Sequence, residues 1–253
     1  MSLFDLSGRI ALVTGSSRGI GYALARGLAE AGATIVLNGV SPGRLAQARE
    51  QLCEEFGETR VHAYAFDVTD AERVDDSVAR IESEVGPIEI LVNNAALQHR
   101  QPLLDVTVED WKRVIDTDLT SAFLVGRAVA RFQIGRGSGK IVNVCSVQSD
   151  LRPTIAPYTT AKGGLRNLTG AMTAEWAASG LQINGLAPGY IHTEMTQALV
   201  DDARFDFWLR GRAPAGRWGT PDDLVGPTVW LASDASRYST VRSSSSGGMT
   251  AVV

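Results

Sequence analysis

The chain has 253 residues, of which 44% are hydrophobic and 21% are charged, and its formal net charge at pH 7 is −4. This length and composition fit one α/β domain with a substantial core, and the slight acidity without a long basic run argues against a nucleic-acid partner. The N-terminus lacks a signal-peptide pattern, and no apolar stretch reaches membrane-spanning length. Cys53 and Cys145 have no metal-binding or redox spacing, so we expect a cytoplasmic protein without a metal site.

Short apolar runs alternate with segments of helical periodicity along most of the chain. The predicted strands cover residues 10–13, 34–37, 61–66, 88–92, 140–144 and 182–186. A first predicted helix ends at Gly32, and further helices are predicted over residues 45–56, 74–85, 111–132 and 158–178. Most of the strands are apolar on both faces, which is typical of a parallel sheet covered by helices on both sides. We therefore predict a single-domain α/β fold over residues 1–253, a Rossmann-type doubly wound parallel sheet in three αβα layers.

Residues 190–220 interrupt the alternation between the sixth predicted strand and the last helix. Residues 193–209 have a helical pattern of mixed polarity, and residues 211–219 are rich in Gly, Pro and Arg. A long excursion at this point is typical of a lid over a substrate site, which we predict here. A rigid structural insertion is the alternative.

Three glycines, Gly15, Gly19 and Gly21, lie between the first predicted strand and the first predicted helix. In this context glycines permit a tight turn and let backbone N–H groups approach a pyrophosphate at the start of the helix. The motif therefore predicts a dinucleotide site, and a tight turn without a ligand is the alternative.

Tyr158 and Lys162 are four residues apart in a predicted helix that follows Pro157, so they share one helix face. A free phenol is a poor base at neutral pH, but a nearby ammonium group stabilises its phenolate form. Ser146, at the end of a hydrophobic run, can add a hydroxyl to the same site. The pair predicts an acid–base centre, and a solvent-exposed surface pair is the alternative.

These motifs occur together in the order of a known family. Along the chain they are Thr14-Gly-x-x-x-Gly-Ile-Gly21, Asn93-Asn94-Ala95, Ser146, Tyr158-x-x-x-Lys162 and Pro188-Gly189. Over roughly residues 5–250 the sequence resembles the short-chain dehydrogenase/reductase family. The resemblance implies a nicotinamide cofactor and hydride exchange with a carbonyl or a secondary alcohol. It also implies that Tyr158 is the general acid/base, that Ser146 holds the substrate oxygen, and that Lys162 stabilises the phenolate and binds the nicotinamide ribose.

The same resemblance implies a set of cofactor contacts. The cofactor-binding residues would be Gly15, Ser17, Arg18, Gly19, Ile20, Gly21, Asp67, Val68, Asn94, Ala95, Tyr158, Lys162, Pro188, Gly189, Ile191 and Thr193. NAD enzymes usually carry an acidic residue after the second strand, where this chain has Gly39. Arg18 resembles the basic residue that pairs with a 2′-phosphate, and Arg44 can assist it. These features favour NADP(H) and leave NAD(H) open, because Val40 stands where NADP enzymes often carry a second arginine.

A narrower resemblance concerns the substrate. Residues 145–151, 187–195, 213–219 and 247–249 look like those of the gluconate 5-dehydrogenase branch. The implied reaction is the reversible oxidation of D-gluconate at carbon 5, and the implied assembly is a homotetramer or homodimer. A sugar acid needs a cation and polar groups, and the candidates by position are Arg100, Arg152, Gln148 and His99. A 3-oxoacyl-acyl-carrier-protein reductase and a weakly catalytic dinucleotide-binding protein are the alternatives.

The chain departs from the family pattern at two places. Asp118 stands where the family has a catalytic asparagine, whose backbone carbonyl holds a water that connects to the lysine. Because an aspartate keeps this carbonyl, we expect Asp118 to serve at the site with reduced but not abolished turnover. Residues 238–246 include four consecutive serines where the family has an apolar seventh strand, so we expect the last edge strand to be lost or irregular.

Overall fold

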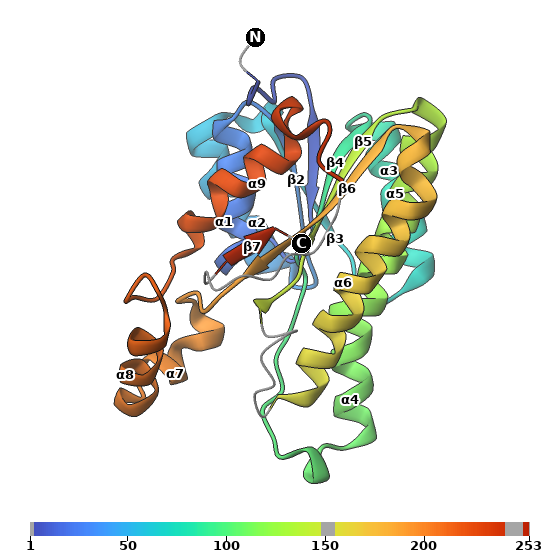
Figure 1. The fold of residues 1–253 in the computed structure, drawn as a ribbon. Coiled ribbons are helices and arrows are strands. Elements are labelled where there is room, and N and C mark those ends of the chain that lie inside the picture. The colour runs from blue at the N-terminus through green and yellow to red at the C-terminus, as the bar shows by residue number, and fades with distance from the viewer. Residues whose placement is uncertain (1–2, 148–154, 241–249, 253) are drawn as a thin grey trace.

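The computed structural model of the protein describes residues 3–147, 155–240 and 250–252 (Figure 1). One sheet runs through it, with the strand order β3-β2-β1-β4-β5-β6-β7. The strands are β1 Ile10–Val13, β2 Thr34–Gly39, β3 Val61–Ala65, β4 Ile88–Asn93, β5 Gly139–Val144, β6 Leu181–Pro188 and β7 Thr250–Val252. Strands β1 to β6 are parallel, and β7 joins β6 in the antiparallel direction at the edge.

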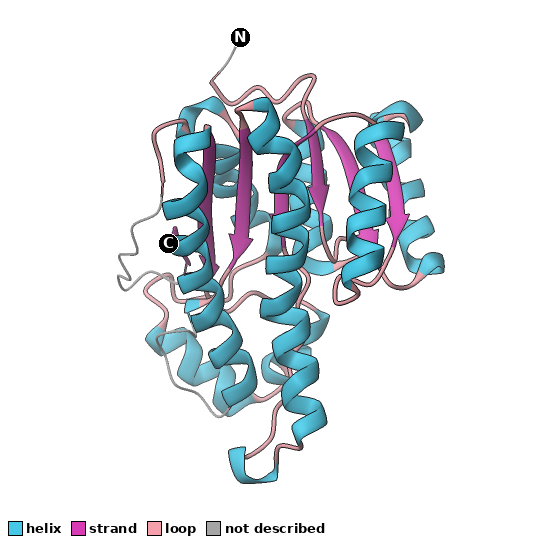
Figure 2. Ribbon diagram, turned by 90° about the vertical axis from the view of Figure 1, so that its right-hand side faces the viewer, coloured by secondary structure: helices cyan, strands magenta, loops and turns pink. Residues whose placement is uncertain are grey.

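Helices cover both faces of the sheet. They are α1 Gly19–Glu30, α2 Pro42–Phe56, α3 Ala71–Glu84, α4 Val108–Ile115, α5 Ser121–Arg136, α6 Ala156–Trp176, α7 Gln197–Val200, α8 Ala203–Arg212 and α9 Val225–Ala232. Figure 1 shows α1, α2 and α9 on one face and α3, α5 and α6 on the other, and Figure 2 views the molecule from the side of the second group. The predicted three-layer, doubly wound parallel sheet is confirmed.

The burial of β1 explains why its sequence is apolar throughout. All four of its residues are buried, and the successive residues Leu12 and Val13 belong to apolar clusters on opposite faces of the sheet. Strand β2 lies on one side of β1 and β4 lies on the other. The carboxyl ends of β1 and β4 therefore border the crevice at which sheets of this kind bind their ligands.

Two predicted helices are divided in the structure. The helix predicted over residues 111–132 consists of α4, a π-helical turn at Asp116–Thr120 and α5. The helix predicted over residues 193–209 is broken between α7 and α8. At this break Asp202 caps α8, because its Oδ1 accepts hydrogen bonds from the backbone N–H groups of Arg204 and Phe205 at 2.9 and 3.2 Å.

The last strand lies after the serine-rich segment rather than within it. Strand β7 pairs Thr250 to Val252 with Pro188 to Leu186 of β6. Of the segment 238–246, residues 241–246 lie outside the described part of the chain. The prediction of a lost or irregular strand within that segment is therefore not tested there. None of the described helices is long and apolar enough to cross a membrane.

The segment between β6 and α9 packs largely on an aromatic cluster of its own. The rings of Tyr190 and Trp218 meet edge-to-face with their centroids 5.9 Å apart, and Phe205 of α8 packs against both. The indole N–H of Trp218 also donates to Oδ1 of Asp206 at 2.8 Å. This cluster attaches α8 to the residues that follow β6.

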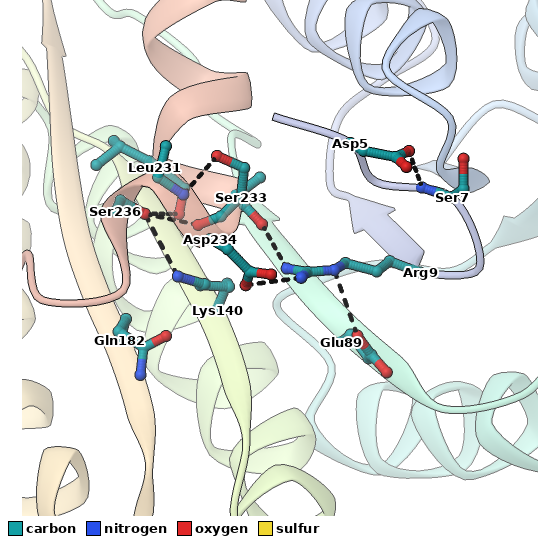
Figure 3. Close-up of polar contacts among 12 residues, drawn as sticks. Asp5, Ser7, Arg9, Glu89, Lys140, Gln182, Leu231, Ser233, Asp234 and Ser236 are labelled. Carbon is teal, nitrogen blue, oxygen red and sulfur yellow. Dashed lines mark hydrogen bonds and ion pairs between the residues drawn. The ribbon is translucent and has the colours of Figure 1, made fainter. Parts of the chain in front are cut away.

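A polar cluster lies at the opposite, amino ends of the strands (Figure 3). The guanidinium of Arg9, before β1, donates to Oδ1 of Asp234 at 2.7 Å, and the ammonium of Lys140 in β5 donates to Oγ of Ser236 at 3.4 Å. Burial lowers the pKa of Lys140 to about 8, and Arg9 acts in the same direction. The cluster therefore joins two strands to the turn that follows α9.

Candidate active site

A cleft of about 700 Å³ opens at the carboxyl ends of the strands. Its wall includes every residue predicted to bind the cofactor, together with Ser146 and Arg100. Asp118 is not part of this wall and lies behind Lys162. Gln148 and Arg152, predicted to contact the substrate, lie outside the described residues.

The turn after β1 has room only for glycines at key positions. Gly15 has a φ of 62°, in the left-handed region that favours glycine. A Cβ at Gly21 would lie 2.4 Å from both Nδ2 of Asn94 and the carbonyl oxygen of Gly15. Helix α1 begins at Gly19 with no side-chain cap and no acidic residue in its first turn. Its first N–H groups therefore remain available to a pyrophosphate, and the residues present fit a dinucleotide.

Three polar side chains, Thr14, Asn38 and Asn94, hold this glycine turn. The hydroxyl of Thr14 accepts hydrogen bonds from the backbone N–H groups of Asn94 and Ala95 at 2.9 and 3.1 Å. The amide of Asn94 donates to the carbonyl oxygens of Thr14 and Gly15 at 3.0 and 3.1 Å. Oδ1 of the buried Asn38 accepts from the N–H of Gly15 at 3.3 Å. No role was predicted for Asn38, although a polar residue at the end of a buried strand is a signal for such a contact.

Arg18 connects the glycine turn to the segment after β6. Its guanidinium pairs with the carboxylate of Glu194, and both residues line the cleft. Gly39, Val40 and Arg44 line the same cleft, and residues 38–41 contain no acidic side chain. The end of the cleft beside β2 therefore carries the guanidinium groups of Arg18 and Arg44. Residues 38–41, at the end of β2, contribute no carboxylate there.

Ser146, Tyr158 and Lys162 meet on the cleft wall. Ser146 follows β5, and the other two lie one turn apart on α6. Nζ of Lys162 donates to the carbonyl oxygen of Val144 at 2.8 Å and lies 5.7 Å from the centroid of the Tyr158 ring. The four-residue spacing thus places the ammonium near the phenol ring.

Buried side-chain hydrogen bonds hold α6 against the sheet. Nδ2 of Asn143 donates to Oγ1 of Thr169 at 2.9 Å, and Nδ2 of Asn93 donates to Oδ1 of Asn143 at 2.9 Å. These bonds fix the helix that carries Tyr158 and Lys162. No role was predicted for Asn143 or Thr169, and the only signal is a polar side chain within an otherwise apolar strand.

Asp118 faces Lys162 from the π-helical turn between α4 and α5. Its Oδ2 lies 4.0 Å from Nζ of Lys162, and its Oδ1 accepts a hydrogen bond from the N–H of Leu97 at 2.9 Å. Burial raises the pKa of Asp118 to about 6, while Lys162 and the N–H of Leu97 act in the opposite direction. A carboxylate that titrates near neutrality is therefore buried beside the lysine of the site.

Arg100 provides a cation on the wall of the cleft. Burial lowers the pKa of Arg100, whereas its electrostatic interactions with Tyr190 and Tyr158 raise it. Its guanidinium donates to Oε1 of Gln98 at 2.9 Å. His99, the other candidate in this loop, instead bonds Oε1 of Gln101 at 2.8 Å and is not part of the cleft wall.

The described residues contain no group of three or more His, Cys, Asp or Glu side chains that could hold a metal ion. Cys145 lies next to Ser146, and burial raises the pKa of its thiol to about 11. A buried thiol of this kind is not a reactive nucleophile.

Comparisons with known proteins agree with this geometry. A family model described as short chain dehydrogenase matches residues 9–204. The chain is 53% identical over 237 residues to a gluconate 5-dehydrogenase of Gluconobacter oxydans (strain 621H), covering 93% of this chain and 92% of the relative. It is 45% identical over 237 residues to a 5-keto-D-gluconate 5-reductase of Escherichia coli (strain K12), with the same coverage of 93% and 92%. Among solved structures, a gluconate 5-dehydrogenase from Burkholderia cenocepacia J2315 in complex with NADP and tartrate superposes with a TM-score of 0.90 at 50% identity, covering 94% of this chain and 92% of that chain.

Proposed function

Because the chain belongs to the short-chain dehydrogenase family, we propose that it is an NADP(H)-dependent oxidoreductase acting on a sugar acid. The proposed reaction interconverts a secondary alcohol and a ketone, of the gluconate and 5-ketogluconate type. The observation that carries the proposal is the placement of Tyr158 and Lys162 on the wall of a cleft that also contains the glycine turn. The names of the similar proteins support the substrate class.

The proposed chemistry assigns one task to each polar side chain. A bound nicotinamide cofactor supplies or accepts the hydride. Tyr158 gives a proton to the substrate oxygen during ketone reduction and takes it back during alcohol oxidation. Ser146 holds that oxygen by a hydrogen bond. Lys162, fixed by the carbonyl of Val144, stabilises the phenolate form of Tyr158.

The choice of NADP(H) over NAD(H) rests on charge. Arg18 and Arg44 line the cleft near Gly39, and no carboxylate follows β2 to repel a 2′-phosphate. A guanidinium recognises phosphate by charge-assisted hydrogen bonds. The complex of the Burkholderia cenocepacia relative with NADP supports the same choice.

Arg100 is the proposed anchor for the substrate carboxylate. Its electrostatic interactions with Tyr158 and Tyr190 indicate that it lies near the reacting end of the cleft. Arg100→Gln is expected to raise KM for 5-ketogluconate about tenfold or more while changing kcat less, because a charge-assisted contact contributes roughly 1.5–3 kcal/mol. A change confined to kcat would contradict this role.

A spectrophotometric assay tests the proposed function. The protein is mixed with 5-ketogluconate and either NADPH or NADH, and the loss of reduced-nicotinamide absorbance is followed. We expect consumption of NADPH in preference to NADH. Tyr158→Phe should lose the activity and keep nearly unchanged cofactor affinity. Activity only on acetoacetyl thioesters would favour an acyl-carrier-protein reductase, and cofactor binding without turnover would favour a binding protein.

The segment at residues 190–220 is proposed to act as a lid. Tyr190, Ile191 and Met195 line the cleft, and Tyr190 also belongs to the aromatic cluster on which α8 packs. Protease cleavage at the break between α7 and α8 should slow when NADPH and a substrate analogue are bound. Equal cleavage rates with and without these ligands would favour a rigid insertion.

The protein is also proposed to form a homotetramer or homodimer. Phe123 and Ile134, about three turns apart on one face of α5, expose 40% and 39% of their surfaces. Exposed apolar side chains along one helix face are typical of a contact surface. Light scattering should give a multiple of the chain mass, and Ile134→Asp should lower it. A monomer for the unchanged protein would contradict the proposal.

A further inference from the structure

The side chain of Asp118 lies beside Lys162, and the proposed chemistry gives it no task. Its Oδ2 is 4.0 Å from Nζ of Lys162, and the side chains of Lys162 and Asp118 expose only 3% and 0% of their surfaces. Asp118 belongs to the π-helical turn that packs against α6. Two elements of the fold therefore bring a carboxylate and the lysine of the site together away from water.

The two oxygens of Asp118 have different surroundings. Oδ1 accepts a hydrogen bond from the N–H of Leu97 at 2.9 Å. Oδ2 is buried and has no hydrogen-bond partner among the described residues. The carbonyl oxygen of Val144 keeps Nζ of Lys162 in place, 2.8 Å away. A neutral asparagine would satisfy the N–H of Leu97 equally well, so the particular property of Asp118 is its charge.

Few other charges are close to this pair. Among the described residues, the titratable or charged groups around it are Lys162, Tyr158 and Arg166 of α6, Cys145 after β5, and Arg100, Arg113 and Asp116 along the cleft. Burial raises the pKa of Asp118 to about 6, and Lys162 lowers it. Asp118 is therefore ionised at neutral and alkaline pH, where the lysine is its nearest opposite charge.

We propose that Asp118 acts on Tyr158 through Lys162: its carboxylate weakens the stabilisation of the Tyr158 phenolate by the lysine ammonium. The inference rests on the proposed function, in which oxidation needs the phenolate as a base and reduction needs the phenol as an acid. A negative charge at ion-pair distance from the ammonium cancels much of its field at the ring. Asp118 thus moves the pH range in which Tyr158 can act as the base of alcohol oxidation to higher values.

Asp118→Asn is compared with Asp76→Asn as the control. Each variant removes one carboxylate, and the Asp76 side chain is exposed on α3, away from the cleft wall. In Asp118→Asn the acid limb of the pH profile of kcat/KM for gluconate oxidation should move about one pH unit lower. At a fixed pH on that limb this corresponds to about a tenfold faster oxidation. In Asp76→Asn the limb should stay in place, and an unmoved limb in Asp118→Asn or an equal shift in both variants overturns the proposal.

A second measurement needs no substrate. The ultraviolet absorbance of tyrosinate is titrated in the unchanged protein and in Asp118→Asn, with Tyr158→Phe added to each as the blank. The tyrosinate absorbance that depends on Tyr158 should appear at lower pH in Asp118→Asn than in the unchanged protein. Titration curves that coincide in the two proteins overturn the inference. If gluconate and 5-ketogluconate give no turnover with either cofactor, the proposed function fails and this titration alone decides the role of Asp118.

Discussion

A carboxylate inside a protein costs folding free energy mainly while it is charged. Burial raises the pKa of Asp118 from its ordinary value of 3.8 to about 6, and Lys162 and Leu97 only partly oppose this. The folded protein therefore binds the proton more tightly than the unfolded chain does. This contribution to stability is complete below pH 3.8 and is lost as the pH rises through 6.

Asp118→Asn should reveal this loss as a pH-dependent difference in stability. The free energy of unfolding of the variant, relative to the unchanged protein, is expected to rise by roughly 2 kcal/mol between about pH 4 and pH 8. Urea unfolding at several pH values measures the difference. A difference that is constant across this range would show that the pKa of the Asp118 carboxyl is not raised in the folded protein.

Gly21 is the position in the glycine turn where packing leaves least room. Gly21→Ala would place a Cβ 2.4 Å from Nδ2 of Asn94 and from the carbonyl oxygen of Gly15. Since overpacking of this kind costs about 1–3 kcal/mol, we expect NADPH affinity to fall roughly tenfold or more in a fluorescence titration. Gly43→Ala is the control, because nothing lies within 4 Å of its Cβ position. Equal affinities in the two variants would contradict a steric requirement at Gly21.

The elements that could be predicted from the sequence are those whose signal is local. Apolar runs identify β1 to β6 because both faces of a parallel sheet are buried, and the spacing of Tyr158 and Lys162 identifies one helix face. The break before α8 could not be predicted. It depends on Asp202, which caps α8 within a stretch whose sequence pattern otherwise continues as one helix. The local sequence marks Asn38 and Asn143 only as polar residues within buried strands. It does not reveal their roles, because their partners come from the glycine turn, β4 and α6.

The ion pair between Arg18 and Glu194 joins the glycine turn to the segment after β6, and both line the cleft. Glu194 competes with a 2′-phosphate for the same guanidinium, so Glu194→Gln should increase NADPH affinity. The expected gain is about two- to fivefold at low salt, because exposed pairs are weak and screened. NADH affinity should hardly change, and Glu72→Gln on α3 serves as the control. An equal gain for both cofactors would exclude this competition.

The polar cluster of Arg9, Lys140 and Asp234 connects the beginning of the fold to its last described helix (Figure 3). Burial and Arg9 lower the pKa of Lys140 from 10.5 to about 8, so the folded protein prefers the neutral amine. This contribution to stability is complete above pH 10.5 and is lost as the pH falls through 8. At neutral pH the side chain of Lys140 is therefore a charged ammonium group although it is buried.

Lys140→Met should consequently gain stability relative to the unchanged protein at about pH 7, and the gain should shrink towards about pH 10. Thermal unfolding across this range measures it. Lys112→Met, at an exposed lysine of α4, should show no such trend. A gain in stability of Lys140→Met that grows with pH would contradict the lowered pKa of Lys140.

The hydrogen bonds around the glycine turn also bear on the kinetics of the whole molecule. Thr14, Asn38 and Asn94 fix this turn through contacts within the protein itself. The entropy of ordering the turn is therefore lost during folding and not at the moment of cofactor capture. Capture needs no slow rearrangement of the backbone, so variants of the cleft should differ in how long the cofactor stays bound more than in how fast it arrives.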